Sequence, residues 1–162
     1  MKYIWILTIV GLWACSTPDP TKKDKEESLG KGASTGYDSL LAAACGADAY
    51  GMRSYIMANL VAGPNRDQDS ATAARLQRAH LDNITRMAEE GKLVLAGPFL
   101  DGGDVRGIYV FAVETVEEAE ALTATDPAIQ AGRLKMELRP WYGSAALMKV
   151  GEIHEKLAKK EI

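Results

Sequence analysis

Four short runs of apolar and alternating side chains predict the strands of a small sheet. The runs are 53–60, 93–96, 108–113 and 136–138. In the first, Tyr55, Met57 and Asn59 fall on one side, and the intervening apolar residues fall on the other. Glycine and proline, which end strands, follow three of the runs at Gly63-Pro64, Gly97-Pro98 and Pro140-Trp141.

Two helices are expected between these strands. Leu76, His80, Ile84 and Met87 recur at spacings of four, four and three, which is one stripe of an amphipathic helix over Ser70–Gly91. Ser70 is its expected N-cap, and Gly91 suits the position just past its end. A second helix begins at Glu114 or Thr115. The order β-α-β-β-α-β predicts an α+β fold, the ferredoxin-like split βαβ with an antiparallel sheet.

The third strand is apolar on both of its sides. Ile108, Val110 and Ala112 fall on one side, and Tyr109, Phe111 and Val113 fall on the other. Because both helices are expected to cover the same face of the sheet, the other face needs a separate cover. A second copy of the chain, packed sheet against sheet, is the simplest cover, so we predict a homodimer. The alternative cover is the C-terminal segment 144–162.

The N-terminus has the pattern of an exported protein. An apolar run of about 11 residues from Tyr3 to Trp13 is too short to span a bilayer and suits a signal peptide. It ends in Leu12-Trp13-Ala14-Cys15, which resembles a bacterial lipobox with Cys15 as the lipidated residue. We therefore expect a lipoprotein signal peptide at 1–15, anchoring in the cell envelope, and a flexible tether at 16–36 rich in Pro, Gly, Ser and charge. A cleaved signal with a chance cysteine is the alternative.

The rest of the chain divides into an α+β domain at 37–148 and a polar tail at 149–162, for which a helix is one interpretation. The net charge is −3 and the basic residues are scattered, so nothing indicates nucleic-acid binding. Cys45 lies among small residues, which favours packing. We expect no cofactor. We also expect no structural zinc site, because the sequence has no CxxC, His/Cys cluster or HExxH motif. Asp101-Gly102-Gly103-Asp104 lacks the ligand spacing of a calcium loop and is interpreted as a turn.

His80 and Asp126 carry the candidate chemistry. An imidazole on the apolar stripe of a helix is either a hydrogen-bonded core residue or a working acid/base. Asp126 precedes Pro127, the pattern of an N-cap with proline at N1, and a carboxylate held in that way is also able to orient an imidazole. Asn83 follows His80 by one turn. Arg106 and Arg139 are interpreted as solvated, although an anionic substrate is a second possibility for them.

Several short motifs, in order, resemble the YCII-related domain family. They are Tyr55, Arg78-Ala79-His80-Leu81, Gly91 to Pro98, Gly107 to Phe111, Glu117-Glu118-Ala119, Asp126 to Ile129 with Ala131-Gly132, and Pro140-Trp141. The resemblance implies a ferredoxin-like domain that forms a dimeric α/β barrel, with an active site built from His80 and Asp126. It also implies elimination or dehydrohalogenation-type chemistry on ring compounds.

The sequence thus predicts a metal-independent lyase or isomerase that acts on a small molecule. His80 is the expected general base and Asp126 its orienting partner. Tyr55, Gly97, Pro98 and Trp141 are the substrate-binding candidates, at a pocket near the strand ends that carry Pro98 and Trp141. The alternative is a non-catalytic envelope module that binds a ligand or partner, in which His80 and Asp126 are structural. Haem or metal binding through His80 is a third hypothesis.

Overall fold

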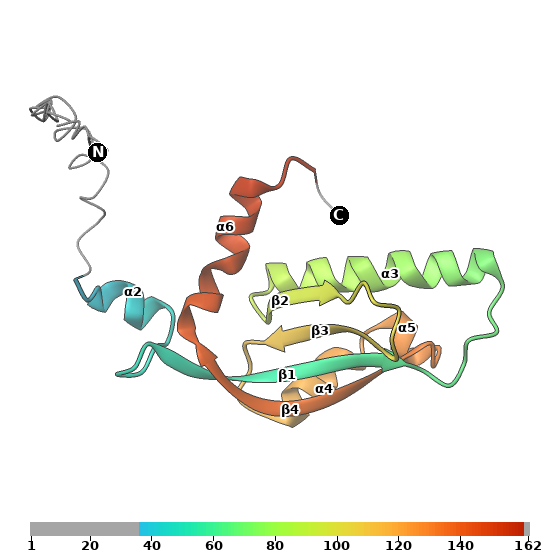
Figure 1. The fold of residues 1–162 in the computed structure, drawn as a ribbon, viewed down its shortest axis with the longest axis horizontal. Coiled ribbons are helices and arrows are strands. Elements are labelled where there is room, and N and C mark those ends of the chain that lie inside the picture. Colours follow the sequence, from blue (N-terminus) through green and yellow to red (C-terminus); the bar gives the residue numbers. More distant parts are fainter. Residues whose placement is uncertain (1–35, 161–162) are drawn as a thin grey trace, which may run out of the picture. The chain divides into compact units, whose positions relative to one another are not determined.

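The predicted strands form one antiparallel sheet in the order β2-β3-β1-β4 (Figure 1). The computed structural model describes residues 36–160, so the predicted signal peptide, Cys15 and nearly all of the tether lie outside the described residues. The strands are β1 (Met52–Ala62), β2 (Leu93–Pro98), β3 (Val105–Phe111) and β4 (Leu134–Ser144). This order, with its two helical crossovers, confirms the α+β ferredoxin-like fold.

Both crossovers lie on one face of the sheet. They are formed by α3 (Ser70–Glu89) in the first, and by α4 (Val116–Thr123) and the single turn α5 (Pro127–Gln130) in the second. The core lies between these helices and the sheet. It contains buried apolar residues of α3, α4, the strands and the segment that follows β3: Ile56, Ala58, Leu60, Met87, Leu93, Tyr109, Phe111, Val113 and Ala119. Burial of this apolar surface is the main stabilising contribution to the domain.

The ends of α3 differ slightly from the sequence-based expectation. Asp69, not Ser70, is the N-cap, and its carboxylate accepts a hydrogen bond from the backbone N–H of Thr72 at 2.9 Å. Asp is at least as good a cap as Ser, so the boundary moves by one residue. Gly91 follows the helix with φ +67°, as expected of a glycine just past a helix end.

β4 is longer than predicted and runs through Pro140-Trp141, which the sequence suggested would end it. Pro140 pairs with Ile56, and the ladder continues to Ser144. The physical reason is position: β4 lies at the edge of the sheet, where one side of the strand has no partner and proline is tolerated. Gly97-Pro98 likewise belongs to an edge strand, β2, rather than following it.

The C-terminal segment covers part of the second face of the sheet. It comprises η2 (Ala145–Lys149), a 3-10 helix, and α6 (Val150–Leu157), so the tail is helical over these residues. The segment η2 contacts β1 and β2, and α6 contacts β2. On this second face Tyr55 and Val110 are buried, whereas Met57, Leu95 and Ile108 are only partly buried. The alternative cover named from the sequence is therefore present, and it leaves part of the face open.

A short helix, α2 (Ser39–Ala44), precedes β1 and was not expected from the sequence. Cys45 follows it and is 4 % exposed, in line with the packing role expected from the small residues around it. Within the part of the chain that the structure describes, no helix is both long and apolar enough to cross a membrane.

Candidate active site

The two candidate residues, far apart in the sequence, meet beneath the long helix. His80 comes from the inward stripe of α3, and Asp126 caps α5. The Nδ1 atom of His80 lies 2.5 Å from Oδ2 of Asp126. The other carboxylate oxygen accepts the backbone N–H of Ala128 at 2.8 Å, so Asp126 is both the predicted N-cap and the partner of the imidazole. His80 is 7 % exposed and Asp126 is 0 % exposed.

The pair fixes the tautomer of His80. An ionised carboxylate only accepts hydrogen bonds, so Nδ1 of His80 carries a proton and donates it to Asp126. In the neutral imidazole the other nitrogen, Nε2, then has the free lone pair. A base must present such a lone pair, and an adjacent carboxylate stabilises the imidazolium that forms when Nε2 takes up a proton.

A third residue, Tyr109 of β3, completes the arrangement. Its hydroxyl oxygen lies 3.3 Å from Nε2 of His80, and the two rings are stacked with centroids 6.1 Å apart. Burial, followed by the negative charge of Asp126, raises the pKa of Tyr109 well above its ordinary value. The phenol therefore stays protonated, and its O–H donates to Nε2. The site is a buried Asp126–His80–Tyr109 chain of hydrogen bonds.

Sequence reasoning missed the role of Tyr109. The residue was noted only as an apolar member of the third strand and as part of a family motif. The available signal was its hydroxyl: a tyrosine on the helix-facing side of a buried strand needs a hydrogen-bond partner, and His80 is a polar group expected to lie on the facing helix.

A second polar cluster ties α3 to the loop that carries Asp126. The carbonyl oxygen of the Asn83 side chain accepts from Arg86 at 2.8 Å and from the hydroxyl of Thr125 at 3.0 Å. Arg86 also donates to the Thr125 hydroxyl at 2.9 Å. These bonds hold the residue next to Asp126 against α3, one turn beyond His80. The Nδ2 atom of Asn83 is buried and has no hydrogen-bond partner within the part of the chain that the structure describes.

The predicted substrate-binding residues do not gather around this site. Tyr109 pairs with Ala58 and faces the helices, so Tyr55, three positions before Ala58, faces the opposite side of the sheet. Trp141 pairs with Tyr55 and shares that opposite face. Gly97 pairs with Ile108, the neighbour of Tyr109, and therefore also lies on the face of the sheet away from the helices.

Pro98 is the one member of that set on the same face as His80. It pairs with Gly107, two positions from Tyr109. Gly107 in turn pairs with Leu60, whereas Trp141 pairs with Tyr55. Five strand positions, roughly 17 Å, thus separate Pro98 and Trp141 along the sheet. The prediction of one pocket near both residues is wrong for a single chain.

Tyr55 and Trp141 have a packing role in this chain. The hydroxyl of Tyr55 donates to the backbone oxygen of Ser144 at 3.0 Å, and its ring lies 5.8 Å from the ring of Trp141. The guanidinium of Arg53 lies 5.2 Å from the centroid of the Tyr55 ring. These contacts join the start of β1 to the end of β4.

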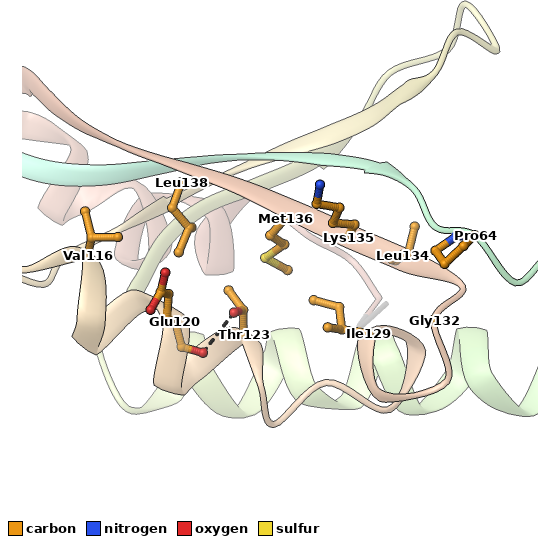
Figure 2. Close-up of a pocket in the computed structure, with 10 residues that line it drawn as sticks. All are labelled: Pro64, Val116, Glu120, Thr123, Ile129, Gly132, Leu134, Lys135, Met136 and Leu138. Carbon is orange, nitrogen blue, oxygen red and sulfur yellow. Dashed lines mark hydrogen bonds between the residues drawn. The ribbon is translucent and has the colours of Figure 1, made fainter.

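A cavity of about 410 Å³ lies between α4, α5 and β4 (Figure 2). Its walls include Thr123 and Ile129, on either side of Asp126 in the sequence, and the β4 residues Met136 and Leu138. Neither His80 nor Tyr109 lines it. The cavity is therefore adjacent to the segment that carries Asp126 but separate from the reactive nitrogen of His80.

Within residues 36–160, no group of three or more His, Cys, Asp or Glu side chains is placed to hold a metal ion. Both ring nitrogens of His80 are hydrogen-bonded within the chain, so ligation of haem iron through Nε2 requires the Tyr109 hydroxyl to move away. His154, the other histidine, is exposed on α6.

The model of the YCII-related domain matches residues 57–142, more than half of the chain and the part that contains His80, Tyr109 and Asp126. The chain belongs to the YCII-related domain family. A relative, the uncharacterized protein YjpA of Bacillus subtilis (strain 168), is 29 % identical over 62 residues, which are 38 % of this chain and 71 % of that protein.

Among solved structures, the chain is similar to the 5-chloro-2-hydroxyhydroquinone dehydrochlorinase TftG from Burkholderia phenoliruptrix AC1100, in complex with 2,5-dihydroxybenzoquinone. The identity is 18 %, the TM-score is 0.40, and the match covers 55 % of this chain and 93 % of the other.

Proposed function

We propose that this YCII-related domain is an enzyme of lyase or isomerase type that transfers protons on a small organic molecule. The observation that carries the proposal is the buried Asp126–His80–Tyr109 chain, with 2.5 Å between Nδ1 of His80 and the Asp126 carboxylate. A carboxylate that fixes the tautomer of an imidazole, next to a phenol held in its protonated form, is a general base beside a hydrogen-bond donor.

The reaction begins when the Tyr109 hydroxyl turns its hydrogen bond from Nε2 of His80 to a substrate oxygen, which frees the lone pair of Nε2. His80 then takes a proton from a carbon next to a carbonyl group or from a hydroxyl group, and Asp126 stabilises the imidazolium. The phenol of Tyr109 donates to the substrate oxygen on which negative charge develops. In an elimination, the electron pair of the broken C–H bond forms the new double bond, and the leaving group departs with its own bonding pair. The proton leaves His80 to solvent.

Hydroxylated ring compounds are the substrate class that we propose. The family resemblance implies elimination chemistry on ring compounds, and this chain retains the histidine and the aspartate on which that resemblance places the site. A ring hydroxyl or carbonyl supplies the oxygen that a protonated Tyr109 recognises, and an adjacent acidic C–H or O–H supplies the proton for His80.

The test is turnover on a panel of halogenated and hydroxylated hydroquinones, together with deuterium exchange at acidic ring C–H positions, measured by NMR. His80→Ala is expected to lower turnover or exchange by about 10²–10⁴-fold, the usual contribution of a general base. His154→Ala, which removes the other, exposed histidine, is the matched control and keeps full activity.

Two outcomes contradict the proposal. Full activity in His80→Ala means that His80 is not the general base. Binding of a ring compound that persists in His80→Asn, with a lowered melting temperature and no exchange in the wild-type protein, favours the non-catalytic envelope module instead. In that case the His80–Asp126 bond is structural.

Cell-envelope anchoring is part of the proposal and rests on the lipobox-like sequence that ends at Cys15. Fractionation of cells that express the full chain tests it. The wild-type protein is expected in the detergent-soluble membrane fraction, and Cys15→Ser is expected to lose the lipid and leave that fraction. An unchanged distribution of Cys15→Ser removes the lipoprotein proposal and leaves the catalytic one standing.

We also propose a homodimer through the open part of the sheet. Met57, Leu95 and Ile108 are only partly buried on that face, and a second sheet is a suitable cover. Sedimentation equilibrium is expected to give a dimer for the wild-type protein and a monomer for Ile108→Lys. Leu157→Lys, a change at an exposed position of α6, is the control and stays dimeric. A monomeric wild-type protein at micromolar concentration refutes this proposal.

A further inference from the structure

Three arginines gather at the end of the sheet where β1 stops. Arg66 lies in the loop that follows β1, Arg133 in the turn before β4, and Arg106 near the start of β3. Arg66 donates from its guanidinium to the backbone oxygen of Arg133 at 3.1 Å. The pKa of Arg66 lies below its ordinary value because of partial desolvation and the positive charges of Arg133 and Arg106 nearby. We call these three residues the arginine cluster.

Backbone hydrogen bonds hold the three segments of the cluster together. The N–H of Gly63 donates to Arg133 at 2.9 Å, and the N–H of Asn65 donates to Gly132 at 2.9 Å. The two turns approach so closely that a Cβ on Gly63 would lie 2.1 Å from the backbone oxygen of Gly132. The N–H of Ala62 donates to Asp104 at 3.1 Å and ties in the segment that leads to Arg106. The cluster therefore stands on a fixed backbone.

The positive charge of the cluster is not neutralised within the described chain. The side chains of Arg66 and Arg106 donate to backbone oxygens, and that of Arg133 donates to the amide oxygen of Gln68. These are neutral acceptors. Among residues 36–160, the ion pairs include none of the three arginines. The carboxylates of Asp69 and Asp101 accept backbone N–H groups of their own segments, at the start of α3 and in the turn before β3.

Arg106 shows most directly that an acceptor is lacking. Its side chain is partly buried, and its Nε atom is fully buried with no hydrogen-bond partner among residues 36–160. The sequence-based interpretation of Arg106 as a solvated arginine is therefore wrong for this atom. A buried donor on a cation costs free energy unless an acceptor, and preferably an anion, is present. Guanidinium groups fit the oxygens of phosphate and carboxylate groups with paired hydrogen bonds.

We propose that the arginine cluster is a binding site for an oxyanion of the phosphate or sulfate type, separate from the His80 site. Three positive charges on a fixed backbone, whose hydrogen bonds within the described residues go to neutral acceptors, match an anionic group with several acceptor oxygens. The exposed side chain of Arg66 keeps the site open to solvent. Free phosphate compounds and the phosphate of an anionic phospholipid share this chemistry, and the experiment distinguishes them.

The test is titration of the purified full chain with inorganic phosphate by calorimetry at constant ionic strength, with acetate and chloride in parallel. We expect saturable binding of phosphate, with weaker binding of acetate and none of chloride. Arg106→Gln and Arg66→Gln are each expected to weaken phosphate binding at least tenfold. Arg66→Gln changes an exposed side chain and so guards against a folding defect in Arg106→Gln.

Arg53→Gln is the matched control. It removes the same charge at the start of β1, roughly 30 Å of strand away from the end where the cluster lies, and is expected to bind phosphate within twofold of the wild-type protein. A second experiment measures binding to vesicles of phosphatidylglycerol. The site is assigned to the lipid phosphate if this binding depends on Arg106 and inorganic phosphate at millimolar concentration does not compete with it.

Three results overturn the proposal. One is a phosphate effect no larger than that of chloride at equal ionic strength, which is charge screening. Another is phosphate binding that is unchanged in both cluster variants. The last is a change of oligomeric state in these variants with no change in anion binding, which means that the arginines pair with a second copy of the chain.

Discussion

Replacement of Asp126 by Asn tests the central geometry of the site without changing its shape. In the wild-type protein the Asp126 carboxylate accepts two hydrogen bonds, from Nδ1 of His80 at 2.5 Å and from the N–H of Ala128 at 2.8 Å. Asparagine has the same size but only one acceptor oxygen. If that oxygen stays with Ala128, the amide NH₂ group faces the Nδ1–H of His80, and two donors meet.

The imidazole resolves this conflict by changing its tautomer. Nδ1 loses its proton and accepts from the new amide, Nε2 becomes protonated, and Tyr109 must then accept from Nε2 instead of donating to it. The lone pair that serves as the base is lost. We therefore expect proton abstraction in Asp126→Asn to fall by about 10²–10⁴-fold, as if the general base were removed.

The stability effect follows from the same two bonds. A hydrogen bond to a charged group contributes about 1.5–3 kcal/mol and one between neutral groups about 0.5–1.5 kcal/mol. Two such exchanges at a fully buried carboxylate lower the free energy of unfolding by about 2 kcal/mol. For a domain of this size the melting temperature falls by about 8 °C.

Nitrogen NMR of histidine-labelled protein reads the tautomer directly and needs no substrate. Asp82→Asn is the matched control, because Asp82 lies on the exposed side of the same helix and forms its ion pair with Arg78, four residues before it. In the control, His80 keeps its proton on Nδ1. A proton that remains on Nδ1 in Asp126→Asn, or a melting temperature no lower than that of Asp82→Asn, refutes this account of the site.

Three further predictions concern the surroundings of the site. The pKa of Tyr109 is raised above 10.0 in the folded protein, so its contribution to the free energy of unfolding is complete below about pH 10 and is lost as the pH rises further. Urea titrations between about pH 9 and 11 should therefore show a smaller loss of stability in Tyr109→Phe than in the wild-type protein. Gly107→Ala places a Cβ 2.4 Å from a backbone oxygen of β2 and is expected to cost about 1–3 kcal/mol in thermal melts, whereas Gly151→Ala, with no atom within 4 Å, costs nothing. Tyr55→Phe is expected to lower stability by about 1 kcal/mol through its lost hydrogen bond while activity stays unchanged, and a fall in activity would restore Tyr55 as a substrate-binding residue.

Hydrophobic periodicity predicted the parts of the fold that depend on local pattern. The stripe that contains His80 gave α3 and its inward face, because the spacing of three and four identifies one side of a helix. The Asp126-Pro127 pair gave the cap of α5 from the chemistry of two adjacent residues. The extension of β4 through Pro140 was missed, because only the order of strands in the sheet shows that β4 is an edge.

Strand register decides which residues share the site, and one sequence does not supply it. The side chains of a strand alternate, so a shift of one position moves every residue to the other face. Tyr109 faces His80 because Tyr109 pairs with Ala58, whose side chain faces the helices. In the same register, Tyr55 and Trp141 face away from the helices. Family motifs identified all three residues but carried no information about faces.

The two faces of the sheet have different roles as a result. The helix-facing side holds the Asp126–His80–Tyr109 chain, where burial keeps the phenol protonated and strengthens its bond to the imidazole. The other side is packed by Tyr55, Trp141 and the C-terminal helices at one end. Arg106 lies on this second side at the opposite end of the sheet, and its buried Nε donor has no acceptor among the described residues. A ligand that reaches His80 and an anion that binds Arg106 therefore use opposite sides of β3, and substitutions at one site are expected to leave binding at the other unchanged.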